Sequence, residues 1–150
     1  MKYVEERALR DQFWSKYGYR RNILAYQFEC PARHGNIDLV TVEKVKDDNG
    51  YHLEIVGFEF KLNDIEKAFS QAYLNTAFCH KSFVVVPADK KQVILERYSS
   101  YFAKYPSIGV IAVSHPEDGG SWDMFHKCKP LPDFSLHFNQ AIMKMCMKTL

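Results

Sequence analysis

The chain has 150 residues and a mass of 17.5 kDa; 47% of its residues are hydrophobic and 25% are charged. This composition excludes an intrinsically disordered chain and is typical of one globular domain that buries its own core. The formal net charge of +2 excludes a histone-like arm and a polybasic membrane anchor.

The sequence shows no sign of export or membrane insertion. It has no run of about 18 apolar residues, which a transmembrane helix requires, and its charged start differs from a signal peptide. The four cysteines form no Cys-x-x-Cys pair. We therefore expect a cytoplasmic protein with reduced thiols, without a disulfide framework, a zinc knuckle or a membrane partner.

The first predicted element is a helix over residues 3–17. Its apolar stripe consists of Leu9, Phe13 and Tyr17. Glu6 falls in the middle of the same stripe, where a carboxylate is desolvated unless another group pairs with it. Gly18 is expected to end this helix as a C′ residue.

Three strand-like runs follow, at 21–29, 36–42 and 53–60. The polar segment between the second and third runs contains Asn49-Gly50, a hairpin signal, so these two strands are expected to be antiparallel neighbours. The next helix is expected to begin at the capping sequence Asn63–Glu66 and to run to about His80.

The remaining elements alternate between strands and helices. In chain order we expect a strand at 82–86, a helix at about 90–105, a strand at 108–113, an edge strand at 121–127 and a helix at 133–150. This order predicts one α/β domain over residues 1–150, with a mixed central β-sheet flanked by helices. Its core would span about 3–113, and a C-terminal hairpin and helix would span about 114–150.

An acid followed two residues later by lysine occurs twice, as Glu59-Phe60-Lys61 and as Asp89-Lys90-Lys91. About two copies are expected by chance, so only context separates them. Asp89 lies at a helix start and is explained as a cap. Glu59 and Lys61 instead close an apolar strand, where alternation places both on one face. Asp38 lies inside another apolar run, on the strand expected to be the neighbour.

Two carboxylates and an ammonium on one sheet face are costly unless they hold a cation or form tight ion pairs. Hard oxygen ligands at a strand end suit Mg²⁺ or Mn²⁺. Such an ion can activate water and stabilise a phosphate transition state, while a neighbouring lysine neutralises developing charge. A structural salt bridge at the strand end remains the alternative explanation of these residues.

This arrangement resembles the PD-(D/E)xK nuclease superfamily over about residues 3–113. The corresponding residues are Glu6 for the first-helix acid, Asp38 for the motif aspartate, Glu59-Phe60-Lys61 for the E-x-K, and Gln71 for a glutamine frequent on the following helix. The resemblance implies a restriction endonuclease-like αβββαβ core. It also implies that Asp38, Glu59 and the Phe60 backbone carbonyl hold Mg²⁺, with Mn²⁺ as a substitute. Lys61 and Gln71 would be catalytic, and Glu6 would be an additional metal ligand.

The sequence departs from the superfamily pattern at two places. Ile37 replaces the proline of the motif, at a position that does not touch the metal. Gln71-Ala72-Tyr73 is shorter than the Gln-x-x-x-Tyr of some exonuclease branches and argues against them. Arg33 and His34, and likewise Lys127 and Lys129, are candidate phosphate contacts, although an ordinary loop and a solvated edge strand explain them as well.

The functional expectation is a metal-dependent hydrolase, a nuclease that cuts DNA with structural guidance or low sequence specificity. Endonuclease and exonuclease action, and DNA and RNA, are not separated by the sequence alone. A non-cleaving nucleic-acid-binding or scaffolding subunit that keeps the nuclease fold is the main alternative, and an ordinary α/β protein with a charged strand end is the third. The small size and apolar tail make a homodimer compatible with each of these.

Overall fold

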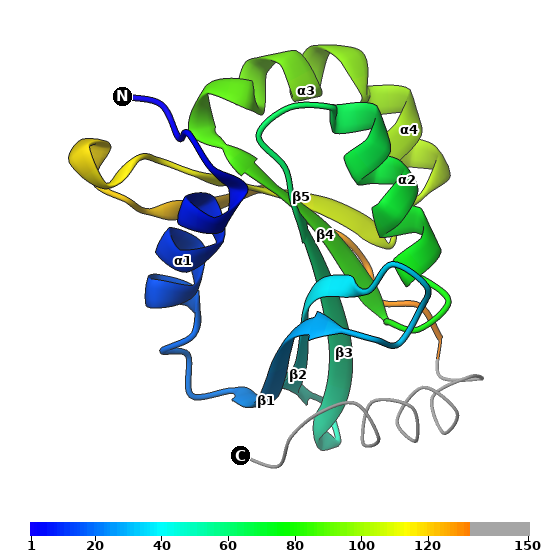
Figure 1. Cartoon of the computed structure of the whole chain (residues 1–150). Coiled ribbons are helices and arrows are strands. Elements are labelled where there is room, and N and C mark those ends of the chain that lie inside the picture. The colour runs from blue at the N-terminus through cyan, green and yellow to red at the C-terminus, as the bar shows by residue number, and fades with distance from the viewer. Residues whose placement is uncertain (133–150) are drawn as a thin grey trace.

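The computed structural model describes residues 1–132, which form a mixed six-stranded β-sheet flanked by helices (Figure 1). The strands are β1 (Ile23–Cys30), β2 (Ile37–Asp47), β3 (Gly50–Phe60), β4 (Lys81–Pro87), β5 (Ile108–Val113) and β6 (Trp122–His126). They lie in the sheet in chain order. Neighbours from β1 to β3 are antiparallel, β3 to β5 are parallel, and β6 returns antiparallel to β5. The predicted fold class is confirmed at this level.

Helices cover both faces of the sheet. They are α1 (Glu6–Tyr17), α2 (Ile65–Asn75), α3 (Lys91–Arg97) and α4 (Ser99–Lys104), with short 3₁₀ turns η1 (Ala88–Lys90) and η2 (Pro116–Asp118). Alternation along β4 divides the core in two, because Phe83 and Val85 pack with α1 whereas Val84 and Val86 pack with α2, α3 and α4. None of the helices within residues 1–132 has the length and apolar character that a membrane crossing requires.

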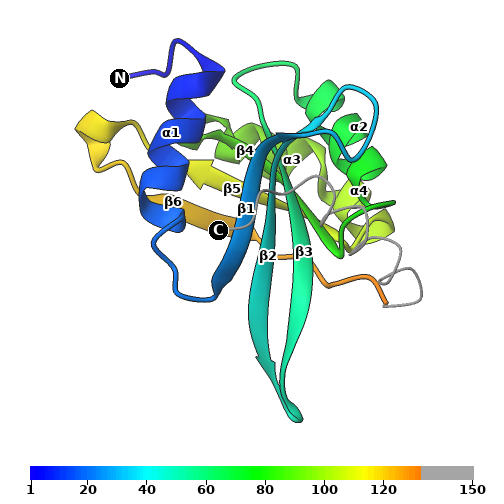
Figure 2. The same ribbon diagram turned by 60° about the horizontal axis from the view of Figure 1, so that its bottom comes forward.

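The β2–β3 hairpin is longer than its hydrophobic runs predict. Its ladder continues to the pair Asp47 and Gly50, and Gly50 has a φ of 112° that favours glycine. Strand β1 pairs with β2 only as far as Glu43. The tip of the hairpin therefore projects beyond the rest of the sheet (Figure 2).

Several predicted helix boundaries are wrong, each for a local reason. Helix α1 begins at Glu6, because the preceding residues are extended and Tyr3 donates its hydroxyl to the Ser114 carbonyl at 2.6 Å. Gly18 is right-handed (φ −66°) rather than left-handed. Glycine is needed there for space, since a Cβ would lie 2.7 Å from the Trp14 ring.

The two later helices are shorter than expected. Helix α2 is capped by Asp64, whose side chain accepts the Lys67 N–H, and it ends at Asn75 because the chain turns back to the sheet, where the His80 N–H reaches the Ile55 carbonyl at 2.8 Å. The helix predicted at 90–105 is interrupted at Tyr98. The helix predicted at 133–150 lies outside the described residues.

We predict that Gly109→Ala destabilises the fold through its β5–β6 contact. A Cβ at this position would lie 2.6 Å from the His126 carbonyl oxygen and 2.7 Å from the Phe83 ring, so backbone must move. Overpacking of this kind costs about 1–3 kcal/mol in the free energy of unfolding. Urea denaturation measures the loss, with Ser100→Ala on the exposed surface of α4 as control. Equal stabilities of the two variants would contradict the close β5–β6 packing.

Candidate functional site

The candidate site forms where the ladder between β2 and β3 ends. The last ladder pair is Leu39 with Phe58, so the next residues, Asp38 and Glu59, face each other beyond it. Their carboxylates accept main-chain N–H groups of the opposite strand. Asp38 Oδ2 accepts the Phe60 N–H at 2.9 Å, and Glu59 Oε2 accepts the Asp38 N–H at 3.2 Å. The expectation that these two carboxylates lie close together on neighbouring strands is confirmed.

Arg33 reaches the same carboxylate pair from the loop between β1 and β2. Its Nη2 lies 3.4 Å from Glu59 Oε1, and its Nε donates to Asn75 Oδ1. The loop folds back through left-handed residues Gly35 (φ 83°) and Asn36 (φ 59°), and the Asn36 N–H donates to the Arg33 carbonyl. Arg33 therefore supplies a nearly buried positive charge, its side chain only 9% exposed, directly against Glu59.

The side chain of α2 that contacts the carboxylate pair is Asn75 rather than the predicted Gln71. Asn75 is fully buried, and its Nδ2 donates to Glu59 Oε2 at 3.1 Å. Gln71 lies one turn earlier and is half-buried, with an Oε1 that is shielded from solvent and accepts no hydrogen bond. In the part of the chain that the structure describes, no hydrogen bond or ion pair joins Gln71 to Asp38, Glu59 or Lys61.

Lys61 and Glu6 meet on the other side of the strand end. Lys61 follows the last residue of β3, so strand alternation does not fix the direction of its side chain. Its main-chain N–H donates to the Val85 carbonyl. Its Nζ lies 3.9 Å from Glu6 Oε2. Glu6 is the first residue of α1 and its side chain is 49% exposed. Glu6 is therefore half-exposed at the start of α1 rather than buried within the apolar stripe, and Lys61 is its ionic partner.

An open pocket of about 300 Å³ lies beside Asp38. Its lining residues are Glu6, Arg7, Arg10, Glu29, Asp38 and Phe60. Arg10 is held in place by its ion pair with Asp11 at 3.0 Å and by the Phe28 ring, 4.8 Å from its guanidinium carbon. Two arginines of α1 thus border the space next to the carboxylates, together with the three acids Glu6, Glu29 and Asp38.

Burial raises the pKa values of both carboxyl groups. Burial, and then the neighbouring charge of Asp38, raises the pKa of Glu59 to about 7, although hydrogen bonds from Asn75 and the Asp38 N–H oppose the shift. Burial also raises the pKa of Asp38, while the Phe60 N–H and the Lys61 ammonium oppose the change. A second cation at this position would favour the doubly ionised pair.

The metal-binding potential of the site rests on these two carboxylates. Within residues 1–132 no group of three or more histidine, cysteine, aspartate and glutamate side chains could hold a metal ion. A two-carboxylate site suits Mg²⁺, which usually keeps several waters, better than zinc. No protein-family model, curated protein or solved structure matches this chain.

We predict that the free energy of unfolding decreases as the pH rises from about 4.5 to about 7. In this interval the folded protein binds more protons than the unfolded chain, because the pKa of Glu59 is raised from 4.5 to about 7. The side chain is 1% exposed, so solvent screens the effect little. The shift corresponds to a decrease of up to about 3 kcal/mol.

Guanidinium denaturation at a series of pH values, in EDTA, measures this decrease. Glu59→Gln should flatten the profile over the same interval, whereas the exposed control Glu96→Gln should keep it. A Glu59→Gln profile as steep as that of the unmodified chain would contradict the assignment.

Proposed function

We propose that the protein is a Mg²⁺-dependent nuclease that hydrolyses phosphodiester bonds in DNA, on a restriction endonuclease-like core. The order α1-β1-β2-β3-α2-β4, with β3 parallel to β4, supports this core. The observation that carries the proposal is the pairing of Asp38 with Glu59 at the end of the β2–β3 ladder, beside a pocket bordered by Arg7 and Arg10.

The residues at the strand end fit a hard divalent cation. Glu59 Oε1 is buried and accepts no hydrogen bond, and the two carboxylates repel each other when both are ionised. Asp38, Glu59 and the Phe60 backbone carbonyl would hold the ion, with waters at the other positions and Glu6 on the open side. When bound, Mg²⁺ or Mn²⁺ would activate water and stabilise charge on the phosphate.

The side chains around the pair have distinct roles in this proposal. The Lys61 ammonium, 17% exposed, neutralises charge that develops on the phosphate oxygens. Arg7 and Arg10 contact the neighbouring backbone phosphates. Gln71 enters the proposed catalytic set only through the family resemblance.

One observation favours a second function, a DNA-binding subunit that does not cut. Arg33 lies 3.4 Å from Glu59 Oε1, on the oxygen that a metal would need. A resident guanidinium already supplies the positive charge that the carboxylate pair requires. If this contact persists on DNA, the protein keeps the core and its phosphate contacts but binds no metal.

We predict metal-dependent cleavage of DNA by the purified full chain. The assay offers linear, nicked, single-stranded and four-way-junction DNA with Mg²⁺ or Mn²⁺. Asp38→Asn, Glu59→Gln and Lys61→Gln should each lower the rate by about 100-fold or more, because each removes several kcal/mol of charge stabilisation. The second acid-x-lysine copy supplies matched controls, and Asp89→Asn and Lys91→Gln should cleave normally.

The same assay separates the two functions. Retained DNA binding without metal-dependent turnover would overturn the nuclease proposal and support the non-cleaving subunit. Turnover that survives Asp38→Asn would assign the activity to another site or to a contaminant.

We predict that Arg33→Gln changes the metal response of the chain. The substitution removes the guanidinium and leaves Glu59 facing an amide, so a divalent cation should bind more tightly. Mn²⁺ titration followed by calorimetry measures the affinity. In the nuclease case the unmodified chain already binds Mn²⁺ and Arg33→Gln strengthens binding, whereas in the non-cleaving case only Arg33→Gln binds. Identical affinities would show that Arg33 does not compete with the ion, and Lys127→Gln is the charge-matched control.

A further inference from the structure

Arg33 and Glu59 face each other at the strand end without a hydrogen bond between them. Arg33 Nη2 lies 3.4 Å from Glu59 Oε1, and the two side chains are 9% and 1% exposed. Both atoms are shielded from solvent, and neither has a hydrogen-bond partner among residues 1–132. The two charges therefore attract each other in a poorly oriented pair, and each atom remains able to bond to another group.

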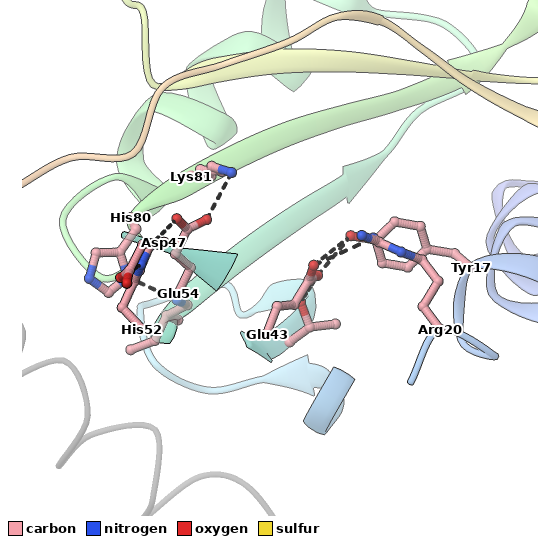
Figure 3. Close-up of polar contacts among 10 residues, drawn as sticks. Tyr17, Arg20, Glu43, Asp47, His52, Glu54, His80 and Lys81 are labelled. Atoms are coloured by element: carbon pink, nitrogen blue, oxygen red, sulfur yellow. Dashed lines mark hydrogen bonds and ion pairs between the residues drawn. The ribbon is translucent and has the colours of Figure 1, made fainter. Parts of the chain in front are cut away.

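The other two buried glutamates among residues 1–132 differ in this respect. Glu43 and Glu54 are direct cross-strand partners on β2 and β3, with 5% and 3% exposure. Figure 3 shows that Glu43 accepts the Tyr17 hydroxyl, at 2.7 Å. Glu54 pairs with the Lys81 ammonium at 2.8 Å and with His52 Nε2 at 2.7 Å (Figure 3). Each oxygen of these two carboxylates has a partner, so the unbonded oxygen at the candidate site is an exception in the described part of the fold.

Within residues 1–132, two polar contacts hold the Arg33 guanidinium to other elements of the fold. Its Nε donates to Asn75 Oδ1 on α2, and its Nη2 faces Glu59. A third contact, from Nη1 to the His34 carbonyl at 2.9 Å, stays within the β1–β2 loop and moves with it. His34 itself is exposed. Release of Arg33 toward solvent therefore breaks one hydrogen bond to another element, together with the ion pair to Glu59.

Release of Arg33 requires a replacement partner for both charges. A buried carboxylate that loses its cation strongly destabilises the fold, so Glu59 needs another cation when the guanidinium leaves. A divalent ion suits its unbonded oxygen, because carboxylate oxygens are preferred ligands of Mg²⁺. The released guanidinium in turn suits a phosphate, whose oxygens match its paired N–H donors. The exchange is therefore favoured when a metal ion and a phosphate are bound together.

We propose that Arg33 is a latch that favours metal binding once DNA is bound. In the free chain its guanidinium lies against the Glu59 oxygen that a metal ion would need. When DNA lies along the strand end, Arg33 transfers to a backbone phosphate and leaves Glu59 Oε1 open to the ion. Metal and DNA then bind cooperatively, because both favour the released state of Arg33. This inference rests on the proposed function and concerns the regulation of the same site.

The test compares the DNA affinity of two full-length chains with and without metal. One chain carries Lys61→Gln, which keeps both carboxylates and slows cleavage under the proposed mechanism, and the other carries Lys61→Gln with Arg33→Gln. The probe is a fluorescent DNA duplex of about 20 base pairs, measured by anisotropy in EDTA and in Mn²⁺. For each chain, the ratio of the two dissociation constants gives the coupling between metal and DNA. Thermal unfolding checks that both chains fold.

We expect the coupling ratio to be at least about fivefold larger in the chain that keeps Arg33. Only in that chain does DNA binding remove a competitor of the ion, whereas direct contacts between metal and phosphate contribute equally to both. The matched control adds Arg97→Gln, on the exposed surface of α3, to Lys61→Gln and should keep the full coupling.

Equal coupling ratios with and without Arg33 would overturn the latch, and so would the absence of DNA binding. If the Arg33→Gln chain fails to fold, the NMR signal of the Arg33 Nε–H group in the Lys61→Gln chain carries the test. That signal should change when DNA is added in Mg²⁺, and an unchanged signal on bound DNA would overturn the latch. Cleavage without this coupling refutes the latch alone, whereas coupling without cleavage refutes the nuclease alone.

Discussion

Where β2 and β3 separate, two carboxylates take over the role of the missing ladder hydrogen bonds. Asp38 and Glu59 each accept a main-chain N–H group of the opposite strand, and this exchange fixes both side chains at the strand end. Because Glu59 is buried, its charge must be met by other groups, and Asn75 and Arg33 reach it from α2 and from the β1–β2 loop. One pair of acids thus connects β2, β3, α2 and the β1–β2 loop.

The two faces of the sheet serve different purposes. On one face α2, α3 and α4 pack against the sheet through an apolar cluster. Asn75 of α2 makes a polar contact with the strand end, a hydrogen bond to Glu59. On the other face α1 is the one helix within residues 1–132, and a pocket lies at each of its ends. Its first residue, Glu6, lines the pocket beside the carboxylate pair, and its last residue, Tyr17, lines a second pocket at the other end.

Patterns of hydrophobicity predict much of this fold, because buried strands and helix stripes are local properties. The strand predicted at 108–113 has the same bounds as β5. Asp38, the isolated acid of the run 36–42, lies beside Glu59 as expected. The contacts of Arg33 and Asn75 were beyond such patterns, since a left-handed loop and a helix that ends early bring them to the site. Glu6 lies on the predicted stripe but at a helix end, where the sheet no longer covers it.

The projecting β2–β3 hairpin has a consequence for how the molecule behaves in concentrated solution. Beyond Lys44, whose N–H bonds to the Asn22 carbonyl, the described part of β1 no longer covers β2. An uncovered strand edge is a template on which another chain can add a strand and begin to aggregate. Lys46 lies on this stretch, and a charged side chain there would have to be desolvated before a neighbour could pair. Lys46 therefore opposes edge-to-edge association of the hairpin with another chain.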